Sequence, residues 1–251
     1  GMSVTGPDAE TPTRAGIPIG DLGSGLYSVI GILSALLSRE QTNMGQHIDM
    51  SLLDVQISLL TYMATMQTLS NIDPEPIGNA HFVHVPYNSF TTQNGFVVIA
   101  VITDAFWEAL LNVVNVESLR DSKFSNSVDR LKNQEFIEAE LNKILSTKPS
   151  EFWIKALNEA KVPCGPINTF SQALSDEQVI HRNMVVEVEH PDGGKVKMPG
   201  NPVKLSYTNE DSYTPPPHLG KNTKEILKEW AGYDEIKIQT LIDKNIVQSI
   251  D

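Results

Sequence analysis

The sequence predicts a mixed α/β fold, because helical and strand patterns alternate along its 251 residues. Apolar residues recur at helical spacing in the first quarter of the chain. Further on, Asn94-Gly95 stands between two apolar runs, which is the strongest short-range hairpin signal. A hydrophobic content of 40% is enough for a sizeable core, in one large domain or two small ones.

A long apolar helix is predicted over residues 22–39, and we expect it to be buried. Its apolar residues recur every three or four positions: Leu22, Leu26, Val29, Ile30, Leu33, Leu36 and Leu37. Alternation over residues 47–50 predicts a short strand. Ser51, with Asp54 three positions later, resembles a capping box and predicts a second helix over residues 52–69. The apolar content of that helix predicts burial on more than one face.

The middle of the chain is predicted to hold a hairpin followed by helices. After a proline-containing linker at 71–76, strands are expected at 88–92 and 96–102. The expected elements that follow are helices at 105–114, 134–145 and 149–160 and a loop at 162–166.

The last third predicts a second hairpin with helices on both sides. Asn168 or Thr169 is expected to cap a helix that ends near His181. The strands are expected at 185–189 and 195–198, and the final helices at 223–230 and 235–244.

Charge and cysteine content restrict the partners. Nineteen basic and 31 acidic residues give a net charge of −12, which argues against nucleic acid or an anionic membrane as a partner. The apolar stretch before Arg39 is interrupted by Ser, Tyr and Gly, so we interpret it as a core helix and not as a membrane span. The single cysteine, Cys164, excludes an internal disulfide and suits the cytoplasm.

Asp21 is the strongest candidate for a catalytic side chain. Gly20, Gly23 and Gly25 flank it just ahead of the long apolar segment. At the first turn of a helix, the dipole and free N–H groups favour an ionised carboxylate, and glycines let a ligand approach closely. This setting suits a carboxylate nucleophile. The alternative interpretation is an ordinary cap, because Asp is among the preferred N-cap residues.

The other polar candidates, two histidines and the cysteine, are weaker candidates for a catalytic or metal-binding role than Asp21. His81 and His84 have no Glu partner or third ligand in their motif, so no metal site is expected. Cys164 has no visible His partner, and we interpret it as a structural loop residue. The prolines and glycine around it fix the backbone direction and are expected to shape a substrate pocket.

Motifs over nearly the whole chain resemble those of the class III CoA-transferases, the CaiB/BaiF-type family. The segments that carry the resemblance are Met2-Ser3-Val4-Thr5-Gly6, Asp21-Leu22, Gly45-Gln46-His47-Ile48-Asp49, Val162-Pro163-Cys164-Gly165-Pro166, Pro216-Pro217-His218-Leu219-Gly220 and Asn222-Thr223 with Glu225-Ile226-Leu227. Compared with that family, the chain corresponds to the last three-fifths of a member.

The resemblance implies two domains and a dimer. Residues 1–70 and 191–251 are then the remainder of a Rossmann-like large domain. Residues 71–81 are a linker, and residues 82–190 are an inserted α+β small domain. Members of the family form interlocked homodimers, so a homodimer is expected here.

The resemblance also implies a reaction, the transfer of coenzyme A between an acyl-CoA and a small carboxylic acid. Asp21 is then the nucleophile, which forms a mixed anhydride and afterwards an aspartyl-CoA thioester, with Gly20, Gly23 and Leu52 at the substrate-binding site. The coenzyme A thioester is a substrate, and no permanently bound cofactor is expected. Residues 78–81 and 85–87 are closer to members that handle dicarboxylic or carnitine-like acids than to formyl transferases.

Two alternatives stay open from the sequence. The first is an acyl-CoA racemase on the same fold, with Asp21 as a proton-transfer base. The second is a non-catalytic remnant that needs a separate N-terminal half.

Overall fold

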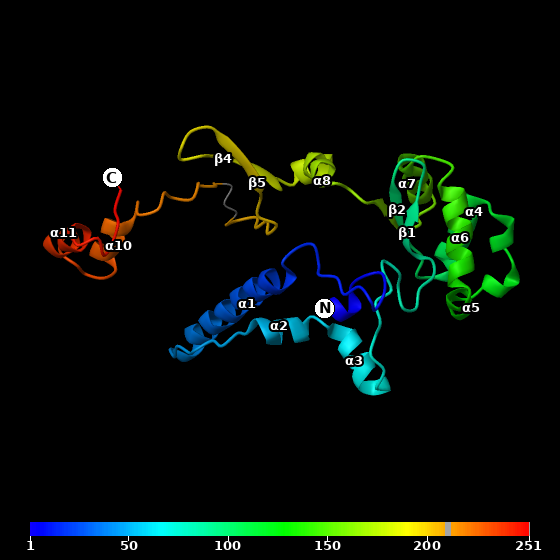
Figure 1. The fold of residues 1–251 in the computed structure, drawn as a ribbon, viewed down its shortest axis with the longest axis horizontal. Helices are drawn as coiled ribbons and strands as arrows, with labels where there is room; N and C mark the ends of the chain where they lie inside the picture. The colour runs from blue at the N-terminus through cyan, green and yellow to red at the C-terminus, as the bar shows by residue number, and fades with distance from the viewer. Residues whose placement is uncertain (209–211, 251) are drawn as a thin grey trace. The chain divides into compact units, whose positions relative to one another are not determined.

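The computed structural model describes residues 1–208 and 212–250, and it divides into the units Gly1–Ile167 and Asn168–Asp251 (Figure 1). Both units combine helices with antiparallel strands, so the predicted mixed fold is confirmed. The domain boundaries expected at residues 70, 81 and 190 stay predictions.

The first unit begins with a 3-10 turn and three helices. The turn is Met2–Val4, and the helices are α1 (Ile19–Thr42), α2 (Leu52–Ser58) and α3 (Thr61–Ser70). Helix α1 extends beyond its predicted range at both ends, and Asn43 ends it in the left-handed conformation, as is common after a helix. Helices α1 and α2 pack against each other (Figure 1).

The prediction that the first helix is buried is wrong. Leu26 is 68% exposed and Leu37 is 69% exposed, whereas Gly23 and Ser24 are the buried residues of α1. Helix α2 contacts α1 around Gly20 and Gly23, so most of the apolar stripe faces solvent. By length and composition alone, α1 would also suffice to cross a membrane, a property that core helices of soluble proteins share. The absence of a membrane partner stays a prediction.

Two further predictions for this region are corrected. Residues 47–50 form no strand, because a strand needs a hydrogen-bonded neighbour and neither described sheet includes them. The helix expected at 52–69 is interrupted before Thr61, which has a positive φ of 50°. Its predicted start is confirmed, since the Asp54 N–H donates to Ser51 Oγ at 3.1 Å. Burial on more than one face is wrong, because Val55 is the only buried residue of α2 and α3 has none.

The best-packed part of this unit is built on a three-stranded sheet. Strands β1 (Tyr87–Thr91), β2 (Phe96–Ala100) and β3 (Cys164–Pro166) are antiparallel, in the order β1-β2-β3. Phe90 lies opposite Val97, which confirms the hairpin predicted from Asn94-Gly95. The Ser150 N–H donates to Asn94 Oδ1 at 2.8 Å, so the turn is tied to the helix that starts there.

Strand β3 corrects the prediction of a loop at 162–166. It pairs with β2, with Gly165 opposite Val98 and Pro166 opposite Val97. It lies at the edge of the sheet, where a residue without an N–H donor is tolerated. Pro166 is therefore compatible with an edge strand.

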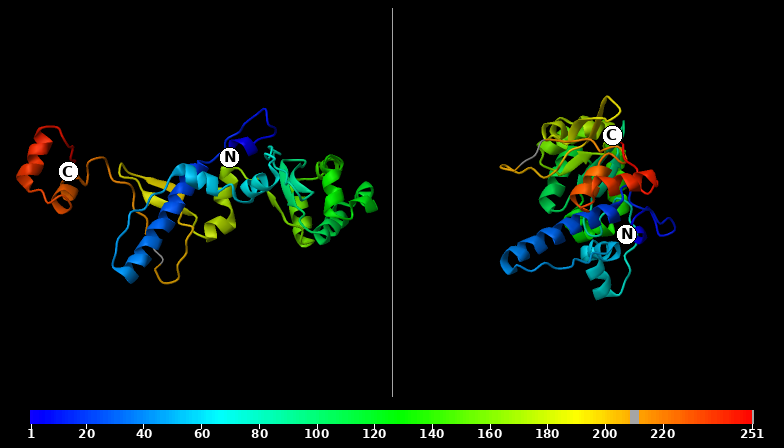
Figure 2. Two further views of the ribbon diagram at one scale, coloured as in Figure 1. Left: turned by 90° about the horizontal axis from the view of Figure 1, so that it is seen from below. Right: turned by 90° about the vertical axis from the view of Figure 1, so that its left-hand side faces the viewer.

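Helices lie around this sheet in Figure 1 and in the left view of Figure 2. They are α4 (Asp104–Val114), α5 (Ser127–Lys132), α6 (Gln134–Leu145) and α7 (Ser150–Glu159), with 3-10 turns at Glu117–Leu119 and Ser122–Phe124. The predicted helices at 105–114, 134–145 and 149–160 are confirmed to within a residue or so. Pro149 stands at the N-cap of α7.

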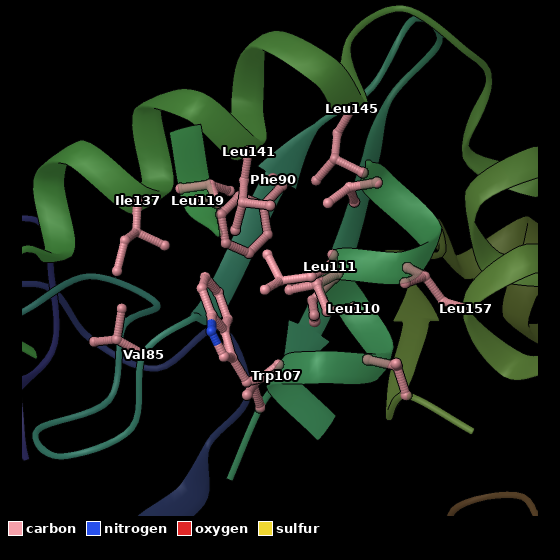
Figure 3. Packing of buried hydrophobic residues seen from close by; sticks show 14 of the residues in the cluster. Val85, Phe90, Trp107, Leu110, Leu111, Leu119, Ile137, Leu141, Leu145 and Leu157 are labelled. Carbon is pink, nitrogen blue, oxygen red and sulfur yellow. The ribbon is translucent and has the colours of Figure 1, made fainter. Parts of the chain in front are cut away.

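Their apolar faces meet in one core, with Phe90, Trp107 and Leu141 at its centre (Figure 3). All three are at most 1% exposed. Arg130 is also buried, and its guanidinium donates to the Val85 and Phe124 carbonyls at 3.1 and 3.0 Å. It also forms a 2.7 Å ion pair with Asp104. Each of the three guanidinium nitrogens thus has a hydrogen-bond partner, which offsets the cost of burying the charge.

The described residues of the second unit form one hairpin and four short helices. Its elements are α8 (Phe170–Ser175), α9 (Glu177–His181), β4 (Val185–Glu189), β5 (Lys195–Pro199), α10 (Thr223–Glu229) and α11 (Glu235–Asp243). The predicted hairpin and last two helices are confirmed, and Thr169 forms a capping box. The helix expected to reach His181 is divided at Asp176, whose carboxylate caps α9.

Candidate functional site

Asp21 lies in the first turn of α1, as predicted, but it is not the cap. The N-cap is Pro18, and no side chain hydrogen bonds to this helix end. The interpretation of Asp21 as an ordinary N-cap residue is therefore wrong. Its carboxylate is exposed at the positive end of a 24-residue helix, where the dipole favours negative charge.

The Asp21 carboxylate also has free hydrogen-bonding capacity. Among residues 1–208 and 212–250 it accepts no hydrogen bond and forms no ion pair. A carboxylate held in an ion pair with a structural cation would lose nucleophilicity and access. Asp21 is thus available to a ligand that approaches the start of α1.

The two glycines beside Asp21 make room for α2. A Cβ atom on Gly20 would meet the Gln56 side chain at 3.3 Å, and one on Gly23 would meet Leu59 Cδ1 at 3.0 Å. A Cβ atom on Gly25 would meet nothing within 4 Å. Gly20 and Gly23 therefore set how closely the two helices approach, and their role in substrate binding stays a prediction.

Leu52 starts α2, the helix that packs against α1. Its side chain is 50% exposed, so it is open to a ligand. The Ser51 cap fixes this helix start. Leu52 and Asp21 are thus carried by one helix pair, and contact of Leu52 with a substrate stays a prediction.

Ser24 is a feature of the site that pattern reasoning missed. It is 5% exposed, and its Oγ has no hydrogen-bond partner among the described residues. A buried polar group left without a partner costs about 1–3 kcal/mol. The sequence does place Ser24 three positions after Asp21, on the same side of the predicted helix. It cannot show that the serine hydroxyl lacks a hydrogen-bond partner.

His81 and His84 lie in the segment between α3 and β1. His81 Nδ1 accepts hydrogen bonds from the N–H groups of Val83 and His84 at 3.1 and 3.2 Å. Its ring stacks on Tyr87 with centroids 5.1 Å apart. Burial, and then the neighbouring His84, lower the pKa of His81. Among the described residues, no three His, Cys, Asp or Glu side chains converge on a point that would suit a metal.

Cys164 is held inside β3 and does not resemble a nucleophile. Its Sγ donates to Asn158 Oδ1 at 3.5 Å, and burial raises the pKa of the thiol. A thiol with a raised pKa is less often a thiolate at neutral pH and therefore less reactive.

An apolar hollow lies between α3 and the segment that follows it. Its volume is about 500 Å³, and it is lined by Met63, Met66, Ile77, Phe82 and neighbouring residues. A smaller hollow of about 250 Å³ shares Met63 with it. Asp21 lines neither of them. The structure thus shows an open carboxylate and a separate apolar hollow in the same unit.

Comparison with known proteins gives one consistent answer. Residues 1–223 match the family described as CoA-transferase family III. Succinyl-CoA:glutarate CoA-transferase of Mus musculus is 33% identical over 252 residues, which cover 98% of this chain and 57% of that one. Acetyl-CoA:oxalate CoA-transferase of Acetobacter aceti is 34% identical over 233 residues, which cover 92% and 59%.

Solved structures agree with this family. A CAIB/BAIF family protein from Brucella suis superposes with a TM-score of 0.71 at 31% identity, over 82% of this chain and 53% of that one. Rv3272 from Mycobacterium tuberculosis superposes with a TM-score of 0.70 over 82% of this chain and 55% of that one, and its 19% identity shows a likeness of fold alone. The chain spans 57% and 59% of the length of the two curated relatives.

Proposed function

Because this chain belongs to CoA-transferase family III, we propose that it transfers coenzyme A between an acyl-CoA and a small carboxylic acid. The observation that carries the proposal is Asp21, an exposed carboxylate without a protein partner at the first turn of α1. Attack on a thioester needs a carboxylate that is accessible and held in place. The helix supplies the fixed position and a favourable dipole.

The proposed reaction uses Asp21 in four steps. Its carboxylate attacks the acyl-CoA carbonyl and expels CoA thiolate, which leaves a mixed anhydride. The thiolate attacks the aspartyl carbonyl, releases the donor acid and forms an aspartyl-CoA thioester. The acceptor carboxylate then attacks that thioester, which gives a second anhydride and free thiolate. Attack of the thiolate on the acceptor acyl carbonyl yields the new acyl-CoA and restores Asp21.

The acceptor is proposed to be a dicarboxylic acid. The curated relatives named above act on glutarate and oxalate, and a further relative in Haloarcula marismortui is a succinyl-CoA:mesaconate CoA-transferase that is 30% identical over 234 residues. These names favour acid exchange over racemisation. Gly20, Gly23 and Leu52 as substrate contacts, a homodimer and a cytoplasmic location belong to the same proposal. Neither a metal nor a permanently bound cofactor is part of it.

The test is an assay of coenzyme A exchange with succinyl-CoA and glutarate, and with acetyl-CoA and oxalate. The chain is assayed alone and with a polypeptide that supplies the part of a relative outside the matched region. We expect Asp21→Asn and Asp21→Ala to lower transfer by about a thousandfold or more, because the nucleophile is lost. Chromatography of the acyl-CoA products measures the transfer.

Asp54→Asn is the matched control, because Asp54 is the first-turn carboxylate of the neighbouring helix α2. It should transfer coenzyme A at the wild-type rate. Normal transfer by Asp21→Asn would contradict the proposed nucleophile. Absence of transfer in every combination would contradict the proposed reaction.

A further inference from the structure

Asp21 and Ser24 lie on the same side of α1, one turn apart. Residues three positions apart on a helix are surface neighbours, with Cβ atoms about 5–6 Å from each other. The helix is continuous from Ile19 to Thr42, so this spacing holds at its start. At this spacing, a serine hydroxyl and an aspartate carboxyl group can come within hydrogen-bonding distance after a change of side-chain rotamer.

Both groups have unused hydrogen-bonding capacity. Other hydroxyls of α1 bond to their own helix: Ser34 Oγ donates to the Ile30 carbonyl and Thr42 Oγ1 to the Ser38 carbonyl, each at 2.8 Å. Ser24 Oγ makes no such bond, although it is buried. Asp21 accepts no hydrogen bond from the described part of the chain. An unpaired donor thus lies one helical turn from an unpaired acceptor.

We propose that Ser24 is a positioning residue for the reaction, and that its hydroxyl donates a hydrogen bond to the Asp21 carboxyl group during transfer. The inference rests on the proposed function. When thiolate attacks the aspartyl carbonyl, the carbonyl oxygen gains negative charge, and a nearby preorganised donor stabilises that charge. The two groups are not bonded in the structure, so the bond forms with a change of rotamer or with acylation.

The first experiment needs no activity. Ser24→Ala removes a hydroxyl that has no partner, so the melting temperature of the full chain should stay unchanged or rise. Ser34→Ala, which removes a hydroxyl bonded to its own helix, is the matched control and should change the melting temperature little. A clear fall for Ser24→Ala alone would show that the protein itself uses the hydroxyl for stability, and it would overturn the inference.

The second experiment uses the combination that transfers coenzyme A. Ser24→Ala should lower kcat about a hundredfold, in the range for loss of one such donor, with little change in KM. Ser24→Cys, which nearly keeps the volume but donates weakly, should fall between Ala and wild type. Ser34→Ala should keep the wild-type kcat.

The outcomes separate the two proposals. If Asp21→Asn abolishes transfer while Ser24→Ala keeps the wild-type kcat, the role of Ser24 is refuted and the proposed function stands. If Asp21→Asn transfers normally, the proposed function fails and the inference fails with it. If Ser24→Ala does not fold, a wild-type kcat in Ser24→Cys refutes the role, and a reduced kcat at unchanged KM supports it.

Discussion

Two regions of the first unit share an apolar pattern at helical spacing but differ in burial. One is the group of helices around the three-stranded sheet, and the other is α1 to α3. Around the sheet, Phe90, Trp107 and Leu141 are at most 1% exposed. In α1, Leu26 and Leu37 are more than two-thirds exposed. Both regions have apolar residues at helical spacing, but only one region contains the second layer that covers them.

This difference shows that helical periodicity predicts the apolar side of a helix but does not predict whether that side is buried. A helical period identifies which side of a helix is apolar. Burial requires another element to pack against that side, and that depends on the rest of the fold. Helix α4 packs against α6 and α7 within the same segment of chain, whereas the main packing partner of α1 is the short helix α2.

The largest expected effect comes from matched leucines in the two regions. Leu141→Ala should destabilise the core by about 2–5 kcal/mol, because it opens a cavity at a fully buried position. Leu37→Ala should change stability by less than about 0.5 kcal/mol, since that side chain is 69% exposed. Urea unfolding followed by tryptophan fluorescence measures both, because Trp107 and Trp153 lie in the core. Equal losses in the two variants would show that α1 is covered in solution.

A medium effect is expected where α1 touches α2. Gly23→Ala places a methyl group 3.0 Å from Leu59 Cδ1, so the packing must shift, and the variant should be less stable than Gly25→Ala by about 1 kcal/mol or more. Gly25→Ala meets open space and should stabilise the helix by up to about 1 kcal/mol. Amide hydrogen exchange of α1 reports both changes. Faster exchange in Gly25→Ala than in Gly23→Ala would contradict the observed contact.

The smallest expected effect is a pH dependence of stability that arises from His81, in the segment between α3 and β1. The pKa of His81 is lowered from 6.5 by burial and by His84, so the unfolded chain takes up this proton first as the pH falls. The stability linked to neutral His81 is fully present above the unfolded pKa of about 6.5, and it is lost as the pH falls below that value towards the lower pKa of the folded state. His81→Asn keeps an acceptor for the local N–H groups but does not titrate. Its free energy of unfolding should therefore fall less between pH 7.5 and 5.5 than that of the wild type, measured by urea unfolding. His47→Asn is the control, and an identical fall in wild type and His81→Asn would refute the linkage.

Signals that depend on a few neighbouring residues predicted structure well. Asn94-Gly95 predicted the hairpin, Ser51 predicted a helix start, and Thr169 predicted a cap. In each case the side chain or backbone freedom that forms the feature lies within three or four residues of it. The position of Asp21 in a first turn follows from the same kind of local signal.

Features that depend on distant residues were mispredicted. Residues 47–50 alternate as a strand does, but no described neighbour pairs with them. The segment Cys164–Pro166 carries two turn-forming residue types, yet β2 provides a partner and makes it a strand. Whether the Ser24 hydroxyl has a hydrogen-bond partner depends on how the side chain packs, so the sequence alone does not predict it. The catalytic role of Asp21 stays a prediction until transfer is measured.

Strand β3 also determines when the sheet is completed during synthesis. The hairpin of β1 and β2 ends at Ala100, and the third strand begins at Cys164, with four α-helices and two 3-10 turns between them. At about 5–20 residues per second, the free side of β2 stays open for roughly 3–13 s after the hairpin has left the ribosome. An open strand edge is a template for pairing with another chain. The edge of β2 is therefore open to intermolecular pairing in that interval, until residues 164–166 pair with it.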